Sequence, residues 1–67
     1  MNEKMPTSKT LLQHAGWLKA LALRLVHDAS RADDLVQQAF LQAIRKPPGE
    51  PKALPRWLAR VARNEAR

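Results

Sequence analysis

Residues 55–67 read P-R-W-L-A-R-V-A-R-N-E-A-R. An α-helix turns by about 100° per residue, so a helix over this segment has two distinct faces. One face is apolar and suited to a core, and the opposite one, which we call the arginine face, carries guanidinium groups. The apolar face comprises Leu54, Trp57, Leu58, Val61 and Ala62, and the arginine face comprises Arg56, Arg60, Arg63 and Arg67.

The arginine face needs an explanation, because like charges one helical turn apart repel each other by a few tenths of a kcal/mol per pair. A basic surface that is simply solvated is one interpretation. Asn64 flanks the arginine face, and the one acid nearby, Glu65, lies at the edge of the apolar side. Because no acidic residue interrupts the arginine face, contact with a polyanion is favoured.

Composition supports an anionic partner and excludes several other classes. The 67 residues carry 12 Lys and Arg against 6 Asp and Glu, a formal net charge of +6, with no cysteine and two histidines. Nucleic acid or another anionic surface fits this balance. No nucleophile with an adjacent base, phosphate-binding loop or metal-ligand cluster is evident, so we predict no enzyme, no metal site and no cofactor.

The N-terminal residues lack the apolar segment of a signal peptide. No run approaches the roughly 18 apolar residues that a membrane span requires. We therefore expect a cytoplasmic protein without a membrane partner.

The periodicity predicts an all-α, compact three-helix bundle with helices over residues 10–27, 31–46 and 55–67. Residues 1–9 are expected to be a flexible N-terminal arm, and residues 10–67 a single domain. The first helix has a possible capping box at Thr10 and Gln13, with Thr7 or Ser8 as alternative caps. Ser30 is the expected N-cap of the second helix, and Pro47 and Pro48 end it.

The expected core follows from the apolar spacing. Gly16 is unfavourable in a helix interior, which suggests that a neighbouring element approaches it closely. The first helix is expected to bury Leu11, Ala15, Leu18, Ala22, Leu25 and Val26, with Trp17 and Leu21 widening this face. The second is expected to bury Ala32, Leu35, Val36, Ala39, Phe40, Ala43 and Ile44.

The second helix also has a polar face with an apolar residue, Leu41, at its middle. An isolated exposed leucine is ordinary on protein surfaces. Between glutamines and an aspartate it equally fits the centre of a docking patch. This polar face comprises Asp34, Gln37, Gln38, Leu41 and Arg45.

Two sequence motifs, one after the other along the chain, resemble those of a known protein family. Residues 32–43 read A-D-D-L-V-Q-Q-A-F-L-Q-A, and a proline-rich loop separates them from P-R-W-L-A-R-V-A-R-N. Together they resemble region 2 of the extracytoplasmic-function (ECF) group of sigma-70-type RNA polymerase sigma factors. The similarity covers about residues 11–67, and it implies the helical sigma region 2 fold.

The resemblance implies a polymerase partner for the second helix. In this family the helix matching D-D-L-V-Q-Q-A-F docks on the clamp helices of the largest subunit of the bacterial RNA polymerase core. By position this assigns polymerase contact to Asp34, Gln37 and Gln38. The helical wheel extends the contact to Leu41 and Arg45.

The resemblance also implies a DNA-binding role for the third helix and the loop before it. Sigma region 2 melts the promoter −10 element and holds flipped bases of the non-template strand. By position, the loop with Lys52 captures bases, Asn64 reads a base edge, and Trp57 mainly packs in the core. The arginine face, Arg56, Arg60, Arg63 and Arg67, would bind phosphates.

Two alternatives remain open at this point. The chain could be a protein-interaction module whose basic helix binds an acidic partner such as an anti-sigma factor, without base recognition. It could also be a cationic amphipathic binder of membrane surfaces. We expect region 4, which reads the −35 element in this family, to be absent from residues 1–67.

Overall fold

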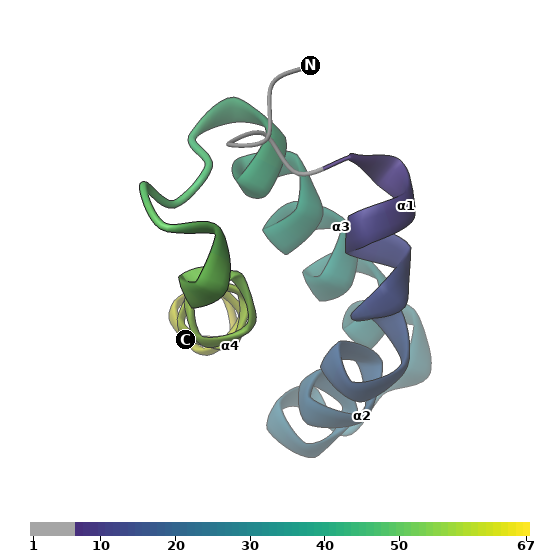
Figure 1. The fold of residues 1–67 in the computed structure, drawn as a ribbon. Coiled ribbons are helices and arrows are strands. Elements are labelled where there is room, and N and C mark those ends of the chain that lie inside the picture. Colours follow the sequence, from purple (N-terminus) through teal and green to yellow (C-terminus); the bar gives the residue numbers. More distant parts are fainter. Residues whose placement is uncertain (1–6) are drawn as a thin grey trace.

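The computed structural model describes residues 7–67, which fold into four α-helices and one short 3-10 helix (Figure 1). No strand occurs in this part of the chain, so the expected all-α class is confirmed. The expectation of three helices is wrong, because the first expected helix is divided in two. The elements are α1 (Ser8–Gln13), α2 (Ala15–Val26), α3 (Ala29–Arg45), η1 (Pro51–Ala53) and α4 (Leu54–Glu65).

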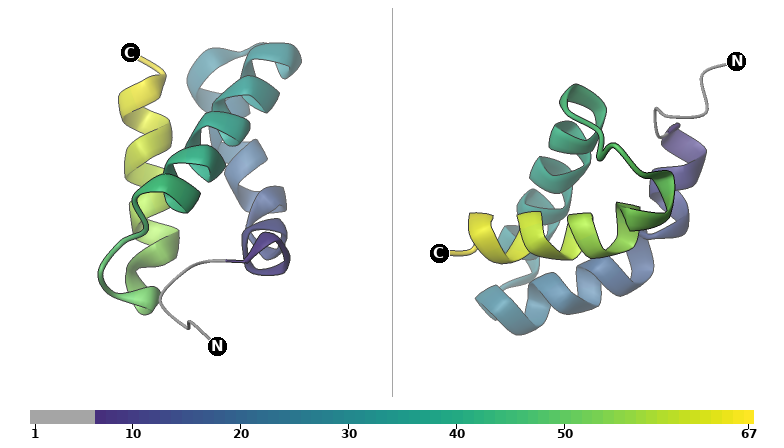
Figure 2. Two further views of the ribbon diagram at one scale, coloured as in Figure 1. Left: turned by 90° about the horizontal axis from the view of Figure 1, so that it is seen from above. Right: turned by 60° about the vertical axis from the view of Figure 1, so that its left-hand side comes forward.

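Three longer helices enclose the core. α2 and α3 form a helical hairpin, and α4 packs against both of them (Figure 2). Only His27 and Asp28 separate α2 from α3, whereas residues 46–53 carry the chain from α3 to α4. Since each of the three helices contacts the other two, their apolar faces share one core.

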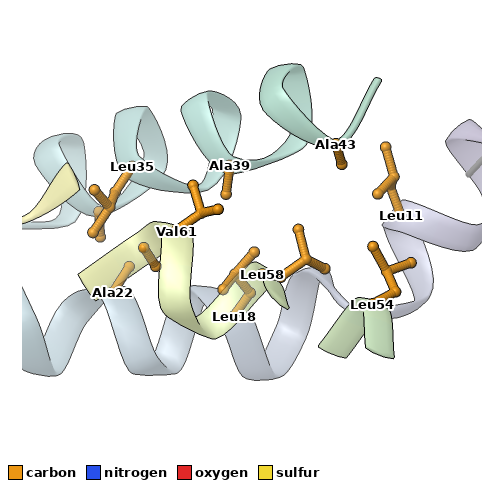
Figure 3. Packing of buried hydrophobic residues seen from close by; sticks show 11 residues of the cluster. Leu11, Leu18, Ala22, Leu35, Ala39, Ala43, Leu54, Leu58 and Val61 are labelled. Carbon is orange, nitrogen blue, oxygen red and sulfur yellow. The ribbon is translucent and has the colours of Figure 1, made fainter. Parts of the chain in front are cut away.

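The first helix breaks at His14. The His14 N–H donates to the carbonyl of Leu11, three residues back, at 2.9 Å, which is the tighter hydrogen bond of a 3-10 turn. The Trp17 Nε1–H donates to His14 Nδ1 at 3.0 Å, and the two rings meet edge to face. This turn changes the direction of the chain, and Figure 3 shows Leu11 at the same end of the core as Ala43 and Leu54.

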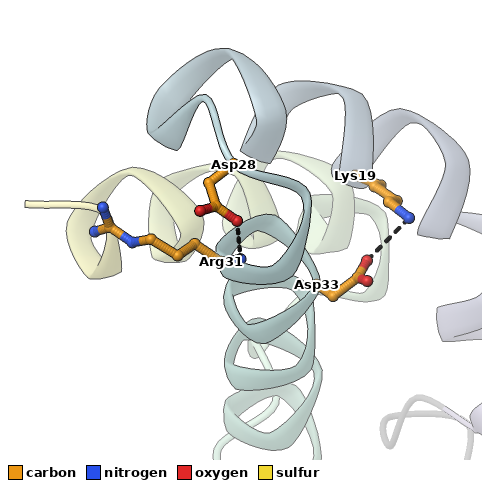
Figure 4. A network of polar contacts seen from close by, with 4 residues as sticks. All are labelled: Lys19, Asp28, Arg31 and Asp33. Carbon is orange, nitrogen blue, oxygen red and sulfur yellow. Dashed lines mark hydrogen bonds and ion pairs between the residues drawn. The ribbon is translucent and has the colours of Figure 1, made fainter.

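The helix starts also differ from expectation. Thr7, one of the alternatives, caps α1, since its Oγ1 accepts the Thr10 N–H at 3.1 Å. The Thr10 capping box is therefore wrong, and α1 begins two residues before the expected start. α3 begins after Asp28, whose Oδ1 accepts the Arg31 N–H at 3.1 Å, and Ser30 lies inside the helix (Figure 4). The rest of the expected arm, residues 1–6, lies outside the described part of the chain.

Small residues of α3 allow the helices to approach closely. Three alanines of this helix are fully buried, as are Leu18 of α2 and Leu58 of α4. Ile44 was expected in the core but is 46% exposed, since it lies at the solvent edge of the α3 apolar stripe. The buried core comprises Leu11, Leu18, Ala22, Ala32, Leu35, Ala39, Ala43, Leu54, Leu58, Val61 and Ala62 (Figure 3).

The expected close neighbour of Gly16 is not found. A Cβ added at Gly16 would meet nothing within 4 Å, and the residue is exposed. Other residues expected in the core, Leu25, Val26, Val36 and Phe40, are partly buried against it. Leu21 also packs against the core, but Trp17 is 38% exposed and Ala15 is only partly buried. The periodicity therefore located the core face of each helix, but it misplaced Ile44 and Trp17.

Candidate functional site

α4 places its two faces as the sequence predicts. Pro55 occupies the first turn, where a missing backbone N–H costs no helical hydrogen bond. Leu54, Leu58, Val61 and Ala62 are buried, and Trp57 is half-buried against the same core. The apolar face of α4 is thus occupied inside the domain, which argues against its insertion into a membrane surface.

The arginine face lies on the solvent side of α4. Arg56, Arg60 and Arg63 are exposed on the helix, and Asn64 is exposed beside them. Arg67 is exposed as well, but it follows the end of α4 at Glu65. The helix therefore fixes the backbone of three arginines at one-turn spacing, and the fourth lies beyond its last turn.

The charge of the arginine face is not compensated by the described residues. Within residues 7–67 the ion pair present joins Lys19 Nζ to Asp33 Oδ1 at 3.0 Å, between α2 and α3 (Figure 4). No carboxylate of this part of the chain lies within 4.0 Å of a guanidinium group of the arginine face. Guanidinium groups without internal partners keep all their donors for an external anion.

The loop before α4 brings one further cation to the arginine face. η1 begins with Pro51 at its first turn, contacts α4, and carries the exposed Lys52. The 3-10 turn ends directly where α4 begins, so Lys52 precedes the end of α4 that carries Arg56. The sequence predicted only a loop for residues 47–54, although a proline such as Pro51 is common in the first turn of a helix.

The polar face predicted for the second helix lies on α3; we call it the α3 polar face, and it is exposed throughout. Asp34, Gln37, Gln38 and Arg45 are exposed, and Leu41 is 43% exposed. Ile44, one turn after Leu41, enlarges the apolar part of this surface. Sequence reasoning missed Ile44 because the apolar periodicity placed it with the core, although it lies farther from the centre of that stripe than Val36 or Ala43.

A hollow of about 190 Å³ connects the α3 polar face with the end of α4. Asp34 and Gln38 border it on α3, and Glu65 and Ala66 border it on the other side. Its remaining lining residues are Val26, Arg31 and Leu35. The structure thus brings two predicted polymerase-contact residues beside Glu65, which sequence reasoning did not connect with them.

The comparison with protein families bears on these two surfaces. The family model for sigma-70 region 2 matches residues 11–67, which include all of α2, α3 and α4. The chain belongs to the sigma-70 region 2 family. Sigma factors are transcription initiation factors, and the resemblance given by the two sequence motifs is confirmed.

Two curated relatives are sigma factors of the ECF group. Both are named probable ECF RNA polymerase sigma factor SigI, from the CDC 1551 / Oshkosh and the ATCC 25618 / H37Rv strains of Mycobacterium tuberculosis. Each is 38% identical to this sigma region 2 chain over 50 residues. The match covers 75% of this chain and 17% of each relative. No solved structure gives a significant match.

Among residues 7–67, no group of three or more His, Cys, Asp or Glu side chains is arranged to hold a metal ion. The helices in this same range are all too short or too polar to cross a membrane.

Proposed function

We propose that this sigma region 2 domain docks on the bacterial RNA polymerase core through the α3 polar face and binds the promoter −10 element through the arginine face. The observation that carries the proposal is the uncompensated arginine face on a helix whose other side is packed in the core. A packed helix holds its cations at fixed spacing, so binding DNA costs little ordering of the backbone. Family membership supplies the class of partner.

In this proposal the arginines and Asn64 have different roles. The four residues of the arginine face bind phosphates and position the strand, which gives affinity without sequence information. Asn64 has both a donor and an acceptor on its side chain, so it can read a base edge. The loop with Lys52 receives flipped bases of the non-template strand.

The energetics explain why both surfaces are needed. If the four arginines each neutralise one phosphate of single-stranded DNA, the logarithmic salt slope is at most about −3. Extruding a base from a duplex costs a few kcal/mol. An isolated basic helix does not supply enough binding energy to melt a promoter, so polymerase contacts at Leu41 and its neighbours contribute the remainder.

Mutations that change one surface at a time test the proposal. Arg60→Glu with Arg63→Glu should abolish binding to single-stranded −10 DNA and leave binding to purified polymerase core unchanged. Leu41→Asp should weaken core binding at least about tenfold, since a charge replaces an apolar contact, and leave DNA binding unchanged. Fluorescence anisotropy with labelled DNA and with labelled protein measures the two affinities.

Matched controls exist on α1 and α2. Arg24→Glu makes the same type of substitution once, with half the charge change of the double variant, away from the arginine face. Leu12→Asp places a charge at a leucine that is 67% exposed. Neither should reproduce the selective losses. If the double arginine variant retains transcription with polymerase, the basic helix serves an acidic protein partner such as an anti-sigma factor instead of promoter DNA.

A further inference from the structure

The hollow between α3 and α4 has an unusual charge for this protein. The chain carries a formal net charge of +6, yet two carboxylates, Asp34 and Glu65, line this one depression. They come from different helices, so neither the local sequence nor a single helical face brings them together.

The other acids of the described residues have partners or lie elsewhere. Asp28 caps α3, Asp33 pairs with Lys19, and Glu50 precedes η1 in the loop. Asp34 and Glu65 form no ion pair within 4.0 Å among residues 7–67, although Arg31 borders the same hollow. Two of the three acids without such an interaction therefore meet at one place.

The lining of the hollow suits a cationic side chain. An incoming cation would offset the charges of the two carboxylates. The apolar lining residues Val26, Leu35 and Ala66 suit the methylene stem of a lysine or arginine.

We infer that the polymerase-docking surface extends from α3 across this hollow to Glu65, and that the hollow receives a lysine or arginine side chain of the polymerase core. The cationic head lies between Asp34 and Glu65, and Gln38 offers its amide oxygen. The inference rests on the proposed docking of α3, and it adds the end of α4 to the surface and names the chemistry that the partner presents.

Binding of the 67-residue chain to purified bacterial RNA polymerase core tests the inference. Glu65→Gln removes one counter-charge and should weaken core binding about threefold, the usual effect of a partly solvated ion pair. Glu65→Lys places a cation at the hollow, where it repels the incoming lysine or arginine of the polymerase, and should weaken core binding about tenfold or more. Because Glu65 is exposed and α4 ends there, neither change should alter the circular dichroism spectrum of the domain.

Glu50→Lys is the matched control, since it makes the same charge change at an exposed acid outside the hollow. It should leave core binding unchanged. If Glu65→Lys binds the polymerase core as tightly as the unmodified chain while Leu41→Asp does not, the proposed binding of a cation in the hollow is wrong and the docking of α3 stands. If neither variant loses affinity, the proposed docking surface is wrong, and the binding of a cation in the hollow is rejected with it.

Discussion

At the scale of single residues, Asp28 stabilises the start of α3. Its carboxylate accepts the Arg31 N–H, which would otherwise lack a partner in the first turn of the helix. It also places a negative charge at the positive end of α3. Both effects act where the chain reverses direction between two core helices, so this residue contributes to the geometry of the α2–α3 hairpin.

Asp28→Ala should destabilise the domain by about 1 kcal/mol, the typical cost of losing an N-cap. For a domain of this size, that lowers the melting temperature by roughly 4–8 °C. Thermal unfolding followed by circular dichroism measures the change. Ser30→Ala is the control and should be close to neutral, because Ser30 lies inside α3; a larger loss for Ser30→Ala would mean that it is the true cap.

His27 is the one described non-glycine residue with a left-handed backbone, at φ 57° and ψ 30°. This conformation is unfavourable for a residue with a Cβ, and helices often end with glycine at such positions. His27→Gly should therefore stabilise the domain by about 0.5–1 kcal/mol in urea unfolding. His27→Ala keeps the Cβ and should not stabilise; equal gains for both would rule out backbone strain as the cause.

At the scale of the elements, the division between α1 and α2 was the main feature hidden from the sequence. Apolar residues continue with helical period through His14, so periodicity alone predicts one helix. At the break, Trp17 donates a local hydrogen bond to His14, three residues before it. Leu11, on the other side of the break, is buried in the core, and this burial is a tertiary effect that periodicity does not report. In contrast, the core faces of α3 and α4 were predictable because strong apolar spacing coincided with clear end signals.

The candidate site was predictable to a similar degree. The exposure of the arginine face and of Leu41 followed from the helical wheel alone. The meeting of Asp34 with Glu65 depends on how α3 packs against α4, and no local pattern encodes that packing. Ile44 was misplaced because a helical wheel shows the direction in which a side chain points. It does not show how much of the apolar stripe the neighbouring helices cover.

Gly16→Ala tests how α2 is stabilised. The position is helical, exposed and open, with nothing within 4 Å of an added Cβ. Alanine is favoured over glycine in helices by up to about 1 kcal/mol, so the substitution should raise the free energy of unfolding by that order. Gly49→Ala, in the loop before η1, should have a smaller effect; a loss of stability in Gly16→Ala would instead indicate a hidden close neighbour.

At the scale of the whole molecule, the fold separates two kinds of surface on one small core. α4 presents cations and Asn64 to solvent, and α3 presents a polar surface with an apolar centre. Because α3 and α4 pack directly against each other, DNA bound on one and polymerase bound on the other would be held at a fixed relative position. A rigid link of this kind suits a factor that must place promoter DNA on the polymerase.

The central claim is that α4 reads bases as well as phosphates. The most direct measurement is fluorescence anisotropy of the chain with a panel of short single-stranded oligonucleotides of varied −10-like sequence, at two salt concentrations. We predict a sequence preference that survives the higher salt, and its loss in Asn64→Ala with only a modest loss of affinity. Binding that is equally tight for all sequences and disappears at the higher salt would contradict the claim, and would reduce the arginine face to an electrostatic anchor.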